Sequence, residues 1–292
     1  MMPLSRRDML RGAAAGAAWL ALGAESSSAA ATRIQASSRL KIAMCDWNLG
    51  KTGDVAAIAL AREIGLDGVE VSVNFPGPGQ HLRDPAVQRE YKAALKREGV
   101  AAPSLALGVL NGVPLKSEPK AALWLADSID AARALGAKVI LVAFFGDGDI
   151  EMEKTAEINR VVDVLKELAP RAEKAKVILG LENTLSAADN LGLLERVGSE
   201  WVQVYYDFWN SAYEGRDVPA EIRLLGKHIC QVHLKNGDAL LSAPGKVDFP
   251  ACAQALREIG YRGWYVLETS SPSGNLVTDT RANVEYVREH FA

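Results

Sequence analysis

Four side chains that can bind a divalent cation each end a short aliphatic or aromatic run: Glu182, Asp207, His233 and Glu268. The gaps between them are 25, 26 and 35 residues, close to the roughly 30 residues that a strand with its crossover helix requires. In a closed barrel of parallel strands the carboxyl ends of the strands meet on one face. We therefore expect the four side chains to converge there.

Three carboxylates and one imidazole predict a site for one divalent cation per chain. Oxygen-rich ligand sets favour hard or borderline cations, so Mn²⁺ is preferred and Mg²⁺ and Co²⁺ also fit, with Zn²⁺ left open. Taken singly, a glutamate at a strand end is usually a cap or a surface charge, and a lone histidine is usually a hydrogen-bonded core group. Four such residues in four successive units favour metal binding.

Eight strand-like runs alternate with stretches that have helical spacing of apolar residues, for example 121–135 and 158–168. The expected strands are 41–45, 68–73, 101–107, 138–144, 177–181, 202–206, 229–234 and 263–267. Glycines are expected to end helices at Gly65, Gly99, Gly136, Gly198, Gly226 and Gly260. This pattern predicts an α/β chain with a single (β/α)₈ TIM barrel. A doubly wound open sheet is the alternative, but no Gly-x-Gly-x-x-Gly turn follows an early strand.

Residues 1–30 are typical of an export signal rather than of the fold. Arg6 and Arg7 precede an apolar run at 12–24 and then a stretch of small residues. The paired arginines resemble a twin-arginine signal, which predicts passage through the export machinery to the periplasm. An uncleaved anchor is disfavoured because a membrane-spanning helix needs about 20 apolar residues, so we expect no stable membrane anchor after cleavage. The barrel domain is assigned to 38–292.

The overall composition is that of an ordinary globular protein. A net charge of −3 argues against nucleic acid or an anionic membrane as a partner. The three cysteines, Cys45, Cys230 and Cys252, are widely spaced and match neither a disulfide framework nor a zinc motif. We interpret them as small buried apolar groups.

The order Glu, Asp, His, Glu at the last four strand ends resembles the xylose isomerase-like TIM barrels. This is the sugar phosphate isomerase/epimerase superfamily, which includes the ketose 3-epimerases. The likeness extends over residues 40–291, and its most specific segments are ILGLEN (178–183), YYD (205–207) and VHLK (232–235). The resemblance implies a metal-dependent enzyme that acts on a small-molecule sugar or glycoside.

The resemblance also implies roles for two of the metal ligands. Glu182 and Glu268 would be catalytic as well as metal-binding, facing each other across the substrate. Glu182 would remove a proton from the carbon next to a carbonyl, and Glu268 would return or accept one on the opposite side, with the enediolate held on the metal. The chemistry is that of a Lewis-acid cation combined with a carboxylate base.

Four further residues are candidates for substrate binding: Trp47, Glu70, Asn210 and Lys235. Trp47 follows a strand near the barrel mouth and could stack on a sugar ring, although such aromatic residues are as often packing. Glu70 could belong to a polar inward stripe or pair with a basic neighbour. Lys235 could hold an oxyanion or be a solvated loop residue. Asn210 stands where related epimerases often have a histidine, which leaves the substrate open.

The leading function is therefore a divalent-metal-dependent sugar isomerase or epimerase. Export disfavours a phosphorylated cytoplasmic substrate. Two alternatives stay open: a 3-keto-glycoside lyase or hydrolase that uses the same site, and a sugar-binding barrel without turnover. Whether the protein forms a homo-oligomer is also open.

Overall fold

The computed structural model describes residues 40–73 and 82–292. Within them eight parallel strands pair in chain order, and the last pairs with the first to close a barrel. The strands are β1 (Ile42–Cys45), β2 (Gly68–Ser72), β3 (Ser104–Leu107), β4 (Val139–Ala143), β5 (Ile178–Glu182), β6 (Val202–Asp207), β7 (Ile229–Leu234) and β8 (Tyr265–Leu267). The predicted barrel is confirmed. The predicted leader, 1–30, and positions 38 and 39 lie outside the described residues.

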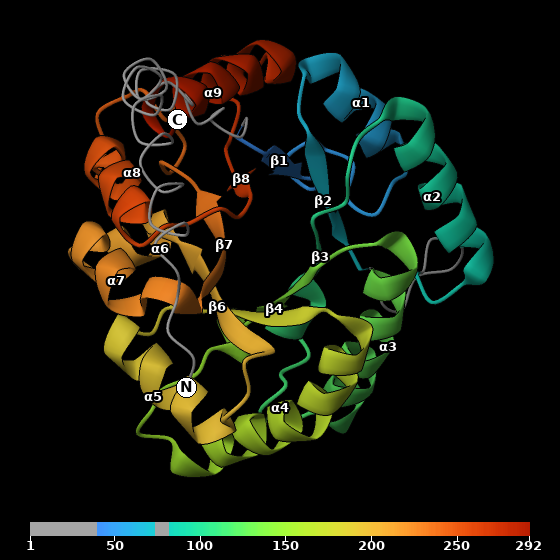
Figure 1. Cartoon of the computed structure of the whole chain (residues 1–292), viewed down its shortest axis with the longest axis vertical. Coiled ribbons are helices and arrows are strands. Elements are labelled where there is room, and N and C mark those ends of the chain that lie inside the picture. The colour runs from blue at the N-terminus through green and yellow to red at the C-terminus, as the bar shows by residue number, and fades with distance from the viewer. Residues whose placement is uncertain (1–39, 74–81) are drawn as a thin grey trace, which may run out of the picture. The chain divides into compact units, whose positions relative to one another are not determined.

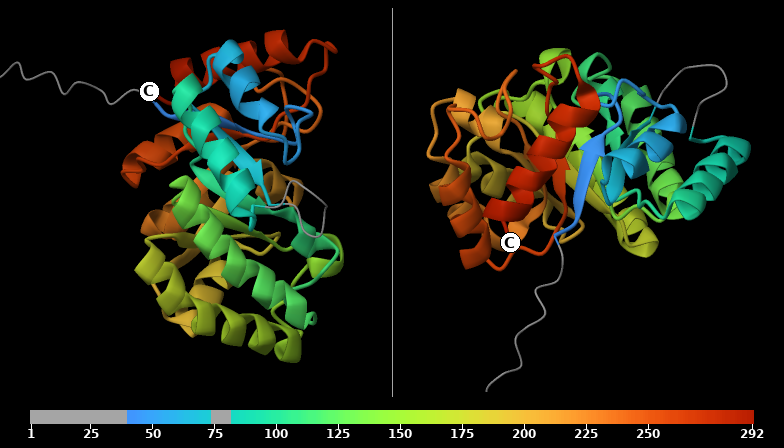
Figure 2. Two further views of the ribbon diagram at one scale, coloured as in Figure 1. Left: turned by 90° about the vertical axis from the view of Figure 1, so that its right-hand side faces the viewer. Right: turned by 90° about the horizontal axis from the view of Figure 1, so that it is seen from above.

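Helices follow the strands and lie in a ring around the barrel (Figure 1). They are α1 (Ala56–Ile64), α2 (Pro85–Glu98), α3 (Pro119–Leu135), α4 (Thr155–Ala175), α5 (Ala187–Val197), α6 (Phe208–Tyr213), α7 (Val218–Leu225), α8 (Phe249–Glu258) and α9 (Leu276–His290), with short 3₁₀ turns η1 (Gly108–Asn111), η2 (Gly146–Gly148) and η3 (Gly226–His228). The last helix, α9, lies beside α1, which completes the ring (Figure 2). In the described part of the chain, no helix combines the length and the apolar character needed to cross a bilayer.

The helix ends follow the local sequence. Side chains of Asp84, Ser186, Asp207, Asp217, Asp248 and Asn275 accept hydrogen bonds from first-turn backbone N–H groups. Gly65, Gly99, Gly136 and Gly198 follow their helices directly with φ between 64° and 97°. Gly226 also directly follows its helix, α7, with φ 53°, and begins η3, whereas Gly260 lies two residues beyond α8, again with positive φ. Most of the predicted helix ends are therefore placed correctly.

Strand residues alternate between two apolar layers, as a pleated strand requires. Ile42 and Met44 of β1 belong to the large cluster between the strands and the helices. Ala43 and Cys45 belong to a smaller cluster with residues of β3, β4, β6 and β8. Side chains from strands on opposite sides of the ring can meet in this way only inside the barrel. The same alternation directs polar side chains into the interior.

Candidate active site

The four candidate ligands come from the last four strands, at one end of the barrel. Glu182 ends β5, Asp207 ends β6, His233 is the next-to-last residue of β7, and Glu268 follows β8 directly. Asp207 is paired with His233 in the β6–β7 ladder, and the backbone N–H of Glu268 donates to the carbonyl of Leu234 at 3.0 Å. The parallel register therefore places the four side chains at one level.

The side chains converge on one nitrogen of the imidazole. His233 Nδ1 lies 2.7 Å from Glu182 Oε1, 3.8 Å from Glu268 Oε2 and 3.9 Å from Asp207 Oδ2. One donor atom from each of the four residues lies within 4.8 Å of all the others. The structure thus brings together all four residues that the sequence selected as ligands.

The donor set fits a divalent cation. Asp207 and Glu182 are 4% and 5% exposed and His233 is fully buried, and buried carboxylates are costly unless a cation or hydrogen-bond donors compensate them. Asp207 Oδ1 accepts the backbone N–H of Asn210 at 2.8 Å, but its Oδ2 is buried with no hydrogen-bond partner among the described residues. Three carboxylates and one neutral imidazole match the ligand preference of Mn²⁺ or Mg²⁺. The residues present could therefore hold the ion.

The carboxyl groups affect one another's protonation. Burial raises the pKa of Glu182, and burial together with Glu268 and Glu182 raises the pKa of Asp207 well above its usual range. Burial alone would lower the pKa of His233, but Glu182, Cys45 and Glu70 together outweigh it and the pKa is raised. Burial would raise the pKa of Glu268, yet His233 and Lys235 outweigh it, and the pKa lies below its usual value. A cation that enters this cluster must displace protons.

A cavity of about 410 Å³ opens beside the cluster. Its wall includes the two glutamates, Glu182 and Glu268, and the aromatic side chains of Trp47 and Phe145. Small interior residues such as Ala106 and Ala143 line it as well, which leaves the space open. The volume is in the usual range for small-molecule sites, which combine an apolar wall with a few polar groups.

Of the four candidates for substrate binding, only some lie at the cavity. Trp47 lines the cavity. Lys235 Nζ donates to Glu268 Oε2 at 3.2 Å, and its side chain is 30% exposed. Asn210 caps Asp207 through its backbone N–H, and its side chain is not among those described residues that line the cavity. Glu70 is fully buried and contacts His233 from the side away from Glu182, again outside the cavity wall.

Sequence reasoning missed several polar residues inside the barrel. Cys45, which the sequence led us to interpret as apolar packing, lies 3.4 Å from His233 Nε2 and 3.7 Å from Glu70 Oε1. Ser104, Tyr205 and Gln231 form one hydrogen-bonded group with Glu70. The available signal was the period of two along each strand, which places Tyr205 and Gln231 two positions before Asp207 and His233 on the same face.

The family model described as "Xylose isomerase-like TIM barrel" matches residues 58–290. The L-ribulose-5-phosphate 3-epimerase UlaE of Salmonella heidelberg (strain SL476) is 30% identical over 259 residues, which cover 80% of this chain and 89% of that protein. These matches confirm both the resemblance inferred from the sequence and the enzyme class, an isomerase or epimerase.

Solved structures share the fold. A D-psicose 3-epimerase studied in the presence of D-fructose superposes with a TM-score of 0.72 and 16% identity, covering 86% of this chain and 99% of that one. The 3-keto-D-glucoside 4-epimerase YcjR from E. coli superposes with a TM-score of 0.68 and 17% identity, covering 86% and 99%. At these identities the likeness concerns the architecture alone.

Proposed function

Since the chain belongs to the xylose isomerase-like TIM barrel family, we propose that it is a divalent-metal-dependent epimerase or isomerase of a sugar with a carbonyl group. One observation carries this proposal. Two glutamates, Glu182 and Glu268, lie within the same candidate metal-binding cluster and also line the cavity that a small molecule would occupy. This arrangement puts proton-transfer groups and cation ligands at one place, as carbonyl-adjacent proton abstraction requires.

The side chains have separate tasks in this reaction. Glu182 removes the proton from the carbon next to the carbonyl, and Glu268 delivers a proton on the other side, so that the configuration is inverted. Lys235 orients Glu268 through its 3.2 Å hydrogen bond. A divalent cation held by Glu182, Asp207, His233 and Glu268 would supply Lewis acidity at the carbonyl oxygen. Trp47 and Phe145 provide the apolar wall against which a sugar ring rests and from which water is excluded.

The substrate is proposed to be an uncharged sugar. The names of the curated relatives include a 5-phosphate, but within residues 40–73 and 82–292 the side chains that line the cavity include no lysine, arginine or histidine. A phosphate group normally requires such cations or a helix N-terminus. Export through the proposed twin-arginine leader would also separate the enzyme from cytoplasmic phosphorylated sugars.

An oxidised glycoside is the second candidate substrate. A structural neighbour is a 3-keto-D-glucoside 4-epimerase, and a 3-keto group offers the same acidic C–H bond to Glu182. If the glycosidic bond lies next to the resulting carbanion, loss of the aglycone would make the protein a lyase. Epimerisation and elimination thus differ in the fate of the substrate and use the same side chains.

Proton exchange tests the proposal. The metal-loaded protein is incubated in deuterated water with free ketoses, aldoses and 3-keto-glycosides, and NMR follows the loss of the C–H signal next to the carbonyl. We expect exchange with at least one neutral sugar and a rate about 10²- to 10⁴-fold lower in Glu182→Gln, the usual contribution of a positioned acid or base. The exposed Glu195→Gln, on α5, is the control. Metal content is measured for each variant.

The three functions give different results in this experiment. Exchange with a new epimer or isomer supports the leading function, and exchange with release of the aglycone supports the lyase. Bound metal without exchange on any sugar would favour a binding barrel without turnover. Retention of most of the exchange by Glu182→Gln would contradict the role of this residue.

The periplasmic location is part of the same proposal and rests on the sequence of residues 1–30 alone. Replacement of Arg6 and Arg7 by lysine is expected to leave the full-length protein in the cytoplasm, since the paired arginines are read by the export machinery. Cell fractionation measures the distribution. Unchanged export would contradict the assignment.

A further inference from the structure

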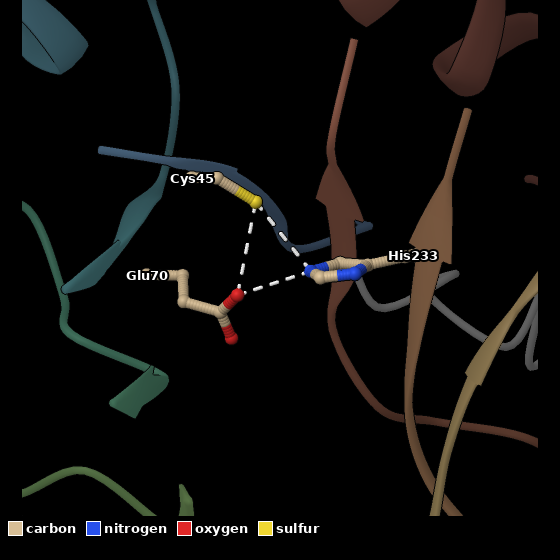
Figure 3. A group of neighbouring side chains, drawn as sticks. All are labelled: Cys45, Glu70 and His233. Atoms are coloured by element: carbon tan, nitrogen blue, oxygen red, sulfur yellow. Dashed lines mark hydrogen bonds and ion pairs between the residues drawn. The ribbon is translucent and has the colours of Figure 1, made fainter. Parts of the chain in front are cut away.

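The imidazole of His233 contacts a second group of side chains on the side away from the metal cluster. His233 Nε2 lies 3.0 Å from Glu70 Oε1 and 3.4 Å from Cys45 Sγ, and Cys45 Sγ lies 3.7 Å from the same oxygen of Glu70 (Figure 3). All three side chains are fully buried. His233 therefore uses both ring nitrogens, with Nδ1 facing the candidate ligands and Nε2 facing the barrel interior.

Glu70 is held in one orientation by its other oxygen. Its Oε2 accepts hydrogen bonds from Tyr205 OH at 2.8 Å and Ser104 Oγ at 2.5 Å. Gln231 Nε2 donates to these two hydroxyl oxygens at 2.9 Å and 2.7 Å, so the hydroxyl protons are directed at Glu70. The remaining oxygen, Oε1, is left to face His233.

The partners of the two ring nitrogens indicate where the imidazole carries its protons. A carboxylate accepts but does not donate, so the hydrogen bond between Glu70 Oε1 and His233 Nε2 requires the proton to reside on Nε2. Nδ1 lies 2.7 Å from Glu182 Oε1, so a proton lies between these two atoms when no cation is bound. A cation that displaces this proton would meet the Nδ1 lone pair, while Nε2 keeps its proton on the side of Glu70. Cys45 cannot substitute for Glu70, since a thiol is only a weak acceptor.

We infer that Glu70 is a positioning residue for the metal centre: it fixes His233 in the Nε2–H tautomer and so directs the Nδ1 lone pair at the cation. This inference rests on the proposed function. Metal-binding histidines usually donate their second N–H to a carboxylate or a carbonyl, which orients the ring and strengthens its basicity. Glu70 is in turn held by hydrogen bonds that involve Ser104 of β3, Tyr205 of β6 and Gln231 of β7.

The variant Glu70→Gln removes the charge and retains the shape. If the amide oxygen faces His233, the amide NH₂ opposes the hydroxyl protons of Ser104 and Tyr205. If the NH₂ faces His233, it favours the tautomer with the proton on Nδ1, which cannot bind metal. In either orientation the affinity for Mn²⁺, measured by calorimetry, is expected to fall by about 10- to 100-fold, as the loss of such outer partners usually causes.

Glu221→Gln is a matched control. Glu221 Oε2 accepts hydrogen bonds from Tyr206 OH at 3.0 Å and Ser211 Oγ at 2.6 Å. Like Glu70, it therefore has one tyrosine and one serine donor, and its side chain is only 12% exposed. It contacts none of the four candidate ligands through a side-chain hydrogen bond in the described residues. Its substitution is expected to lower the stability of the fold. The Mn²⁺ affinity should stay within about twofold of wild type, because the hydrogen bond between Glu70 and His233 is retained.

A spectroscopic measurement on the wild-type protein tests the tautomer without any variant. The chain contains four histidines, so ¹⁵N-histidine labelling gives few signals, and His233 is assigned by His233→Gln. With diamagnetic Mg²⁺ bound, long-range proton–nitrogen spectra are expected to place the His233 proton on Nε2. A proton on Nδ1 in the loaded protein would overturn the inference.

The remaining outcomes are separable. If wild type binds no divalent ion, the proposed function fails and the inference fails with it. If wild type binds Mn²⁺ and Glu70→Gln binds it equally well, only the inference fails. A second bound ion per chain that Cys45→Ser removes would also overturn it, because Glu70 would then be a ligand itself. Should Glu70→Gln not fold, Tyr205→Phe removes one of the donors to Glu70 and is expected to weaken Mn²⁺ binding severalfold.

Discussion

The two glutamates at the cavity have different surroundings. Glu182 has only His233 as a close hydrogen-bond partner among the described side chains, and burial raises its pKa. Glu268 has Lys235 beside it, and its pKa is lowered although burial acts in the opposite direction. Because a bound cation would change both pKa values, the proposed roles of the two glutamates rest on their positions at the cavity and not on these pKa directions. Lys235 is thus the residue outside the cluster whose loss should affect chemistry most directly.

Lys235→Met is expected to lower kcat/KM by about 10- to 100-fold. The hydrogen bond from a charged donor to Glu268 contributes about 1.5–3 kcal/mol, and its loss leaves the catalytic carboxylate without its orienting partner. Steady-state kinetics with the substrate found by NMR measures the effect, and metal content should be retained. Lys246→Met, which removes a loop lysine stacked 4.9 Å from the ring centroid of Tyr213, is the control. Equal activity in both variants would contradict the role of Lys235.

At the scale of the elements, the interior of the barrel near the site is closely packed. Gly180 of β5 has no side chain, and a Cβ there would lie 2.9 Å from Cys230 Sγ and 3.2 Å from Tyr205 Cβ. Tyr205 in turn holds Glu70 in place. The absence of a side chain at position 180 therefore allows β5 to lie close to the strands that carry the interior polar group.

Gly180→Ala is expected to destabilise the protein by about 1–3 kcal/mol, the usual cost of overpacking a dense core. Urea denaturation measures the free energy of unfolding. Gly192→Ala is the paired control, because Gly192 lies inside α5 and a Cβ there would meet no atom of a neighbouring element within 4 Å. Replacing this helical glycine by alanine should instead raise the free energy of unfolding by about 0.5–1 kcal/mol. Equal effects of the two changes would show that close contact at position 180 is unimportant.

Asp46 joins the turn after β1 to the end of β2. It accepts the backbone N–H groups of Gly53 and Ser72 at 2.9 Å and 2.8 Å and the Ser72 hydroxyl at 2.5 Å. Burial nevertheless raises its pKa from 3.8 to about 6. The folded state thus binds a proton more tightly than the unfolded state, so the free energy of unfolding should fall as pH rises from 3.8 to about 6.

The variant Asp46→Asn isolates this contribution. Between about pH 4 and pH 7, wild type is expected to lose up to about 3 kcal/mol of stability relative to the variant, at about 1.4 kcal/mol for each pKa unit. Chemical denaturation of both proteins across this range gives the difference. A difference that does not change with pH would contradict the raised pKa of Asp46.

Sequence patterns predicted the elements better than their ends. The strand expected at 101–107 begins only at Ser104, because Pro103 has no N–H to donate to the ladder. The strand ends that carry the four candidate ligands lie within one residue of the predicted positions, since each ligand lies at the end of an apolar run: Glu182, Asp207, His233 and Glu268. The role of Glu70 could not be predicted, since its partners come from four other strands and their facing positions depend on the barrel register.

At the scale of the whole molecule, the candidate ligands belong to four adjacent strands. A cation held by Glu182, Asp207, His233 and Glu268 would link β5, β6, β7 and β8 at their carboxyl ends. A ligand that binds only the folded state adds its binding free energy to the free energy of unfolding. The stability of the barrel should therefore depend on the metal.

Mn²⁺ at about 100 times its Kd is expected to stabilise the protein by about 2.7 kcal/mol. This corresponds to a rise in Tm of about 5–10 °C for a domain of this size. Differential scanning fluorimetry with and without a chelator measures the shift. Asp207→Asn should abolish most of it, and a shift that is equal in this variant would place the ion elsewhere.

The proposed function depends on one divalent cation bound at these four strand ends, between two glutamates that face the cavity. Crystals grown with Mn²⁺ would reveal the ion directly, through anomalous diffraction data at the manganese edge. We expect one strong peak about 2.0–2.3 Å from Glu182, Asp207, His233 Nδ1 and Glu268. A manganese peak bound elsewhere, or no peak in this cluster at saturating Mn²⁺, would show that these residues do not form the metal site.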